Sequence, residues 1–209
     1  MVNEEVDLSV KNSVHIIGIG GAGMGAIAEV LATMGHVVSG SDIKDSHRLD
    51  RLRAFGVEIF IGHDSKNVKS VNFVARSTAI SDSNIECLQA VENGIPLLSR
   101  EKVLRSISKL KDSIAVSGTH GKTTTSSMLS LVLREAGLKP SFIIGGEVNE
   151  IGTGAVWDEG ELLVIEADES DASFLGLKRK LSIITNLEED HLEYFGGFEA
   201  LYEAFVKFG

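Results

Sequence analysis

The sequence predicts an α/β protein of two units, each built on a parallel sheet. Three observations lead to this class. Short apolar runs alternate with helical patterns through all 209 residues, an order that favours parallel strands covered by helices. Two glycine-rich stretches each follow an apolar run and open a helical pattern. The alternation also restarts after a polar junction at 109–113, so we place one unit at 1–110 and a second at 111–209.

The first unit contains five apolar runs of strand length, at 14–19, 36–42, 57–62, 71–77 and 95–99. Helical patterns lie between them at 24–35, 48–56 and 84–94, and the first two end at glycine, which is a common helix stop. This βαβα order predicts a Rossmann-like unit. A further helical pattern with a polar junction, 100–113, leads into the second unit.

The second unit repeats the alternation but contains fewer elements. Strands are predicted at 113–118, 141–146, 161–168 and 181–186, and helices at 122–137 and 198–209. Gly137 ends the first of these helices, and Pro140 follows shortly after it. These elements are few for a complete nucleotide-binding sheet. We therefore expect a unit that is cut short.

Composition excludes several classes of protein. The net charge is −10, with 30 acidic and 20 basic residues, which argues against a nucleic-acid-binding or anionic-membrane-binding surface. The sequence contains no apolar run of about 18 residues, so no membrane span is expected. The acidic start "MVNEEVDLSVKN" does not resemble a signal peptide. Cys87, the only cysteine, lies in a helical pattern and is interpreted as a packing residue. We therefore expect a cytoplasmic protein.

The stretch "GIGGAGMG" is the first candidate site. Gly18, Gly20 and Gly23 fit G-x-G-x-x-G between a strand and a helix, where glycines let backbone N–H groups approach a diphosphate. Asp42 ends the next strand, where a ribose-binding acid is expected. A tight turn without a ligand is the alternative. The motif does not decide which nucleotide binds, so an NAD-dependent oxidoreductase stays open.

The stretch "SGTHGKTTTSS" is the second candidate site. Lys122 is placed to reach β- and γ-phosphate oxygens, and Thr123 to coordinate Mg²⁺. Val116 stands where the usual P-loop spacing has glycine, which indicates a shorter loop of the same kind. A helix cap by Ser117 or Thr119 is the alternative, but a cap does not need Gly-Lys-Thr. The second unit is thus predicted as part of a P-loop ATPase α/β domain.

Acidic side chains follow two strands of the second unit, at the sheet edge that also carries the P-loop. They are Glu166, Asp168, Glu169 and Asp171 after one strand, and Glu188, Glu189, Asp190 and His191 after the other. Oxygen and imidazole groups at this edge predict a magnesium site. Four other histidines are interpreted as structural, although the last follows the third strand at the first ligand edge: His15, His36, His47 and His63.

Several motifs together resemble the Mur ligases: "HIIGIGGAGMGAIAEVL", "GSD", "SGTHGKTTT", "EADESDASF" and "TNLEEDH". The resemblance extends from Val14 to about Phe208 and includes the short phosphate loop. It implies that ATP binds at Gly118, Thr119, His120, Gly121, Lys122, Thr123 and Thr124. It implies that Mg²⁺ binds at Thr123, Glu166 and His191, and that Lys122, Glu166 and His191 are catalytic. It implies that the loop under the diphosphate of a UDP-sugar consists of Gly20, Gly21, Ala22 and Gly23. The other residues that line the sugar-nucleotide site match less securely: Ser41, Asp42, His63, Ser77 and Arg100.

The resemblance also implies a reaction. ATP would activate the carboxylate of UDP-N-acetylmuramate as an acyl phosphate, and L-alanine would displace phosphate to form an amide in peptidoglycan precursor synthesis. Glu193 stands where the family usually has aspartate. Family members also continue beyond residue 209 into a C-terminal domain that closes over ATP. We therefore expect these 209 residues alone to be inactive, and a non-catalytic nucleotide-binding module stays open as an alternative.

Overall fold

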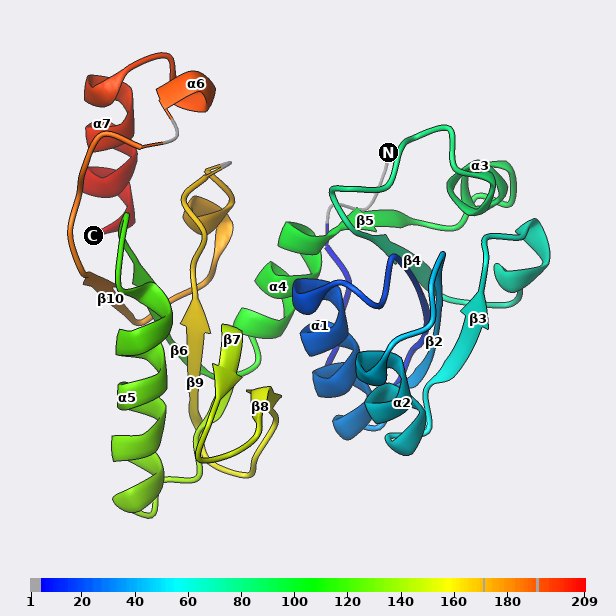
Figure 1. Ribbon diagram of the computed structural model, residues 1–209, viewed down its shortest axis with the longest axis horizontal. Helices are drawn as coiled ribbons and strands as arrows, with labels where there is room; N and C mark the ends of the chain where they lie inside the picture. The colour runs from blue at the N-terminus through cyan, green and yellow to red at the C-terminus, as the bar shows by residue number, and fades with distance from the viewer. Residues whose placement is uncertain (1–4, 171, 191) are drawn as a thin grey trace. The chain divides into compact units, whose positions relative to one another are not determined.

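The computed structural model describes residues 5–170, 172–190 and 192–209. Its internal contacts divide the chain into two units, Met1–Ser106 and Ile107–Gly209, close to the predicted boundary. Each unit has its own five-stranded sheet (Figure 1).

The first unit is an open, fully parallel sheet with the strand order β3-β2-β1-β4-β5. This arrangement confirms the predicted Rossmann-like class. In chain order the elements are β1 (Ser13–Ile17), α1 (Ala22–Thr33), β2 (Val37–Asp42), α2 (His47–Ala54), β3 (Glu58–Ile61), the 3₁₀ helix η1 (Ser65–Asn67), β4 (Phe73–Arg76), α3 (Ile85–Glu92), β5 (Leu97–Ser99) and α4 (Arg100–Ser108).

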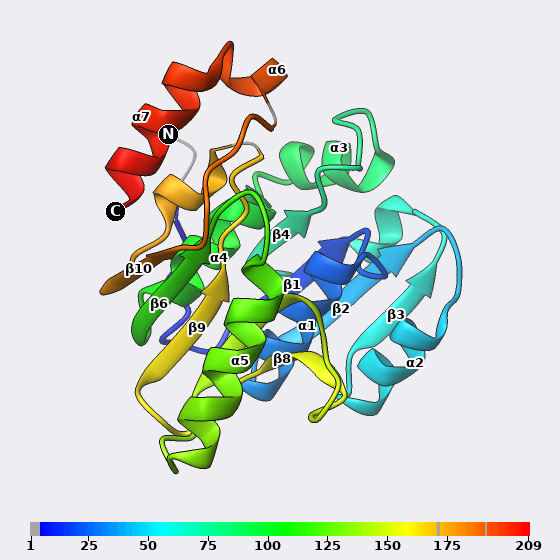
Figure 2. The same ribbon diagram turned by 60° about the vertical axis from the view of Figure 1, so that its left-hand side comes forward.

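The apolar sequence of β1 explains its central position. Val14, Ile16 and Ile17 are completely buried, as expected for a parallel strand with both faces covered. Helices α1 and α2 pack against each other, α1 on β2 and α2 on β3 (Figure 2). Helix α1 begins at Ala22, two residues before the predicted start, because the glycine loop turns directly into the helix.

The second unit has the strand order β10-β6-β9-β7-β8, with β6 between β9 and β10. Its elements are β6 (Asp112–Ser117), α5 (Lys122–Glu135), β7 (Ser141–Val148), β8 (Thr153–Val156), β9 (Leu162–Glu166), the 3₁₀ helix η2 (Ser173–Gly176), β10 (Leu181–Ile184), α6 (Leu192–Phe195) and α7 (Phe198–Phe208).

Strand β8 was not predicted, and it pairs antiparallel with β7, whereas the other strand pairs of this sheet are parallel. Its sequence, "TGAV", is only four residues long and contains glycine, so it lacks an apolar run that a pattern can detect. Helix α4 also ends at Ser108, earlier than the predicted stretch 100–113.

Helix α5 packs on β6, β7 and β9 (Figures 1 and 2). At the other end of the unit, α7 packs on η2 through Phe174, Phe205 and Phe208. The Phe174 ring centroid lies 5.1 Å from that of Phe205 and 4.9 Å from that of Phe208. None of the helices in the described part of the chain has the length and apolar character that a membrane crossing requires.

Candidate functional site

The loop between β6 and α5 has a backbone that requires glycine at two positions. Gly121 has φ +80° and caps α5, and Gly118 has φ +133°. A Cβ on Gly118 would lie 2.9 Å from the carbonyl oxygen of Asn186. These conformations bring the backbone N–H groups at the start of a 14-residue helix to the concave side of the loop, where an anion is favoured.

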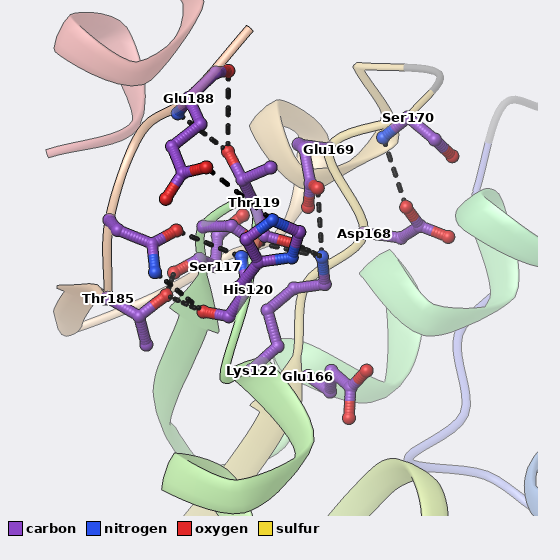
Figure 3. A network of polar contacts seen from close by, with 12 residues as sticks. Ser117, Thr119, His120, Lys122, Glu166, Asp168, Glu169, Ser170, Thr185 and Glu188 are labelled. Carbon is purple, nitrogen blue, oxygen red and sulfur yellow. Dashed lines mark hydrogen bonds and ion pairs between the residues drawn. The ribbon is translucent and has the colours of Figure 1, made fainter. Parts of the chain in front are cut away.

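A second segment, residues 185–188 after β10, holds this loop in shape (Figure 3). The His120 N–H donates to Asn186 Oδ1 at 2.9 Å, and the Glu188 N–H donates to Thr119 Oγ1 at 2.9 Å. The Thr185 hydroxyl donates to the His120 carbonyl at 2.6 Å. The loop is therefore fixed by hydrogen bonds before any ligand binds, which lowers the ordering cost of binding.

Lys122 is the cation of the loop. Its ammonium donates to the Gly118 carbonyl at 2.8 Å and to Glu169 Oε1 at 2.8 Å. The Lys122 side chain is 17% exposed and that of Glu169 only 2% (Figure 3). The positive charge therefore lies inside the loop, and phosphate oxygens would compete with Glu169 for it.

Thr123 and Glu166 form a hydrogen-bonded pair of oxygen-bearing side chains near this cation. The Thr123 hydroxyl donates to Glu166 Oε1 at 3.2 Å, and the Gly145 N–H donates to Glu166 Oε2 at 2.9 Å. Hydroxyl and carboxylate oxygens suit Mg²⁺, so these two residues fit the predicted ion. The third predicted ligand, His191, lies outside the described residues, as does Asp171.

The remaining acids of this edge have other partners. Asp168 Oδ1 accepts from the Ser170 N–H at 3.0 Å, and Glu188 Oε2 lies 3.6 Å from His120 Nε2. Thr124 lies in the first turn of α5. In the part of the chain that the structure describes, no group of three or more His, Cys, Asp or Glu side chains could hold a metal. The described geometry thus centres on Lys122, Thr123 and Glu166.

In the first unit, the glycine loop joins β1 to α1. The Gly20 N–H donates to Asp42 Oδ2 at 2.9 Å, so the predicted ribose-binding acid lies against the loop. Gly21 caps α1, which begins with Ala22. A Cβ on Gly23 would lie 2.6 Å from Arg100 Nε.

Arg100 has an unpaired polar atom at this loop. Its Nε is buried and has no hydrogen-bond partner among the described residues. A buried donor without a partner costs free energy, and an anion at the loop would relieve that cost. Ser77 also lies near the loop, because a Cβ built on Gly18 would be 3.1 Å from the Ser77 Cβ. The loop is thus bordered by a guanidinium and a hydroxyl-bearing residue.

Ser41 and His63 meet at a carboxylate that sequence reasoning missed. The Ser41 hydroxyl donates to Glu86 Oε2 at 2.5 Å, and His63 Nδ1 lies 3.0 Å from the same oxygen. Asn67 Nδ2 donates to Glu86 Oε1 at 2.7 Å. Burial would raise the pKa of Glu86, but hydrogen bonds from His15, Ser41 and Asn67 outweigh it and lower the pKa to about 2. Glu86 therefore stays ionised.

No signal in a single sequence identified Glu86 or Gly145. Glu86 lies in the first turn of α3, where an acidic residue is expected as a solvated helix start. Gly145 belongs to the predicted strand 141–146 and was interpreted only as part of it. His15 was interpreted as structural, and it is completely buried with Nε2 3.5 Å from Glu86 Oε1.

Comparisons with known proteins identify the family of the chain. The Mur ligase family catalytic domain model matches residues 13–112, and the Mur ligase middle domain model matches residues 116–209. A UDP-N-acetylmuramate–L-alanine ligase of Endomicrobium trichonymphae is 47% identical over 199 residues, covering 95% of this chain and 44% of the relative. The chain thus spans less than half the length of the curated relatives it matches.

Two solved structures are also similar. The UDP-N-acetylmuramate–alanine ligase of Thermotoga maritima has a TM-score of 0.87 at 33% identity, covering 94% of this chain and 46% of that one. The UDP-N-acetylmuramate:L-alanyl-γ-D-glutamyl-meso-diaminopimelate ligase of Neisseria meningitides has a TM-score of 0.85 at 30% identity, covering 95% of this chain and 68% of that one.

The fold defines an α/β protein of two units, each with a glycine loop between a parallel strand and a helix. Within that class, the two family models together cover nearly the whole chain. The chain belongs to the Mur ligase family.

Proposed function

We propose that this chain supplies the UDP-sugar site and the ATP site of a ligase that joins L-alanine to UDP-N-acetylmuramate. The observation that carries the proposal is the convergence of Lys122, Thr123 and Glu166 at a loop that is already held in shape. The names of the relatives at about 47% identity support the choice of substrates. A cytoplasmic location is part of the proposal, because the reaction consumes ATP.

The ATP half of the proposal assigns roles to the second unit. Gly118 to Thr124 would surround the phosphates, with Lys122 leaving Glu169 to neutralise the β- and γ-phosphate oxygens. Thr123 and Glu166, with His191, would hold Mg²⁺. That ion, when bound, supplies Lewis-acid stabilisation of the charge on the phosphoryl group.

The UDP-sugar half assigns roles to the first unit. Backbone N–H groups of Gly20 to Gly23 and the unpaired Nε of Arg100 would hold the diphosphate. Asp42, Ser41, His63 and Ser77 would line the remainder of the sugar nucleotide. The oxidoreductase alternative uses the same loop but leaves the Lys122 loop of the second unit without a purpose.

The proposed reaction has two steps, and its atoms balance. A carboxylate oxygen of the muramate attacks the γ-phosphorus, and the bond to ADP breaks. The amine of L-alanine then attacks the acyl carbon, phosphate leaves, and the amine loses a proton to form the amide. Lys122 contributes by neutralising charge as the phosphoryl group transfers. No covalent enzyme intermediate is required.

Calorimetric titration tests the proposal. The chain is titrated with UDP-N-acetylmuramate, with NADH and with Mg-ATP, and the same titrations are run on Lys122→Ala. We expect binding of the UDP-sugar and of Mg-ATP, with only the Mg-ATP heat lost in the variant. Binding of NADH without the UDP-sugar would instead establish the oxidoreductase alternative.

An assay with UDP-N-acetylmuramate, L-alanine and Mg-ATP, read by mass spectrometry, adds the reaction itself. Amide product at about 1 s⁻¹, within the usual enzyme range, would establish the ligation directly. Binding of both nucleotides by Lys122→Ala as by the unaltered chain would refute the assignment of the phosphate loop.

A further inference from the structure

The first unit contains a buried polar cluster around Glu86, a residue to which the proposed function assigns no role. Glu86 and His15 both have side chains that are completely inaccessible to solvent. Ser41 from β2, His63 after β3 and Asn67 from η1 contact Glu86, so four separate parts of the fold converge on one carboxylate. A buried carboxylate is costly unless every partner is placed well. The cluster therefore specifies the orientation of its members.

The proton positions in the cluster follow from its geometry. The ionised Glu86 carboxylate can only accept hydrogen bonds, so at the 2.5 Å contact Ser41 must donate its single hydroxyl hydrogen to Glu86 Oε2. His63 Nδ1 lies 3.0 Å from both Ser41 Oγ and Glu86 Oε2, and both oxygens are acceptors toward it. Nδ1 must therefore carry a hydrogen. In the neutral imidazole, Nε2 is then an acceptor.

None of the described residues donates a hydrogen bond to His63 Nε2, whereas the side chain keeps 15% of its surface exposed. His63 follows β3, which pairs with β2, and β2 ends at Asp42 beside the glycine loop. The carboxyl ends of these strands form the edge where a nucleotide binds in this class of sheet. His63 thus presents an acceptor at the ligand edge.

We propose that Glu86 is a positioning residue that holds His63 in the Nδ1–H form, so that Nε2 accepts a hydrogen bond from the uridine half of the sugar nucleotide. This inference rests on the proposed UDP-sugar site. The hydrogen donor is either N3–H of uracil or the 2′-hydroxyl of the ribose. Cytosine has no hydrogen at N3, so contact with the base would also reject a cytidine nucleotide.

The first experiment needs no ligand. Long-range ¹H–¹⁵N correlation spectra of the ¹⁵N-histidine-labelled chain at pH 8 distinguish the two neutral forms of each imidazole, and His63→Gln assigns the signal. We expect a pure Nδ1–H form for His63 in the unaltered chain. Ser41→Ala keeps it, because the 3.0 Å contact with Glu86 remains. Glu86→Gln loses it, because an amide can donate as well as accept.

A matched control is Glu92→Gln on the exposed end of the same helix, which should leave the His63 signal unchanged. If Glu86→Gln does not fold, the spectra of the unaltered chain and of Ser41→Ala still decide the matter. An Nε2–H form in the unaltered chain would overturn the inference. A pure Nδ1–H form that persists in a folded Glu86→Gln would overturn it too.

The second experiment measures binding of UDP, CDP and 2′-deoxy-UDP to the unaltered chain and to Glu86→Gln. We expect Glu86→Gln to bind UDP about tenfold more weakly, which corresponds to loss of one hydrogen bond of about 1.4 kcal/mol. If the uracil is the donor, CDP binds weakly to both proteins and 2′-deoxy-UDP keeps the tenfold difference. If a ribose 2′-hydroxyl is the donor, 2′-deoxy-UDP binds weakly to both proteins and CDP keeps the tenfold difference.

The two experiments separate this inference from the function on which it rests. Equal UDP affinity in the unaltered chain and Glu86→Gln would overturn the role of Glu86 and leave the UDP-sugar site intact. No UDP binding by the unaltered chain would refute the UDP-sugar site and the ligand contact together, whereas the spectra would still decide whether Glu86 orients His63.

Discussion

Removing either member of the Lys122–Glu169 pair should weaken the second unit measurably. The two charged atoms are 2.8 Å apart, and the side chains are 17% and 2% exposed. Coulomb's law at an effective dielectric constant of about 20 gives roughly 6 kcal/mol of attraction, most of which offsets the loss of hydration. Breaking a buried pair typically costs 3–5 kcal/mol, and because Lys122 also donates to the Gly118 carbonyl we expect about 2–4 kcal/mol.

Trp157 makes the measurement specific to one unit. It is the only tryptophan, and its ring lies 4.4 Å from Lys111 Nζ within the second unit. Urea unfolding followed by its fluorescence therefore reports on that unit. The proteins compared are the unaltered chain, Lys122→Met, Glu169→Gln and the double variant. Methionine retains most of the alkyl chain, so packing changes little.

We expect the double variant to lose less stability than the two single variants combined, by at least about 1 kcal/mol, because neither charge is then left alone. Adding Mg-ATP at a hundredfold excess over its Kd should stabilise the unaltered chain by about 2.7 kcal/mol, and Lys122→Met hardly at all. Strict additivity of the two substitutions, together with an equal gain from Mg-ATP in Lys122→Met, would refute both the buried pair and the phosphate contact.

Four further predictions concern other parts of the structure. Gly118→Ala should destabilise the second unit by about 2–4 kcal/mol in the same urea assay, through its positive φ and its contact with Asn186; a change under about 0.5 kcal/mol would contradict this. Phe174→Ala should cost about 3–5 kcal/mol by releasing α7, with exposed Tyr202→Ala as the neutral control. Gly23→Ala should weaken UDP-sugar binding at least tenfold in calorimetry by displacing Arg100, and unchanged affinity would remove Arg100 from the site. Folding lowers the pKa of Glu86 from 4.5 to about 2, so the ionised carboxylate stabilises the folded state by about 3 kcal/mol above pH 4.5. This stabilisation is lost as pH falls toward 2. Circular dichroism of the first unit should show that loss, and Glu86→Gln should show much less of it.

The sequence predicted the elements whose signals are local. Strand β1 is a continuous apolar run followed by the G-x-G-x-x-G loop, so both its position and its burial could be inferred. Lys122 and Thr123 were identified because a Gly-Lys-Thr at a strand–helix junction has few other uses. Strand β8 gave no such signal, because a short edge strand pairs through its backbone and needs little apolar sequence.

The contacts within the site could not be predicted, because they join residues far apart in the chain. Glu86 lies 45 residues from Ser41, and its helix gives no indication that the carboxylate points into the core. Glu169 was one of several acids expected near the predicted magnesium site, and its partner in the structure is Lys122, 47 residues away. Which acid accepts from Thr123 and which pairs with Lys122 depends on side-chain direction, which a residue pattern does not specify.

The clamp of residues 185–188 on the phosphate loop has a consequence for protein synthesis. The bond from the His120 N–H to Asn186 joins positions 66 residues apart, so the loop cannot acquire its final form until β10 has been made and has paired with β6. At 5–20 residues per second, translation of that interval takes roughly 3–13 s. During those seconds the nascent β6–α5 segment would contain Lys122 without the hydrogen bonds from residues 185–188. ATP should therefore be unable to accelerate early folding on the ribosome, and its stabilising effect should begin only after Glu188 has left the exit tunnel.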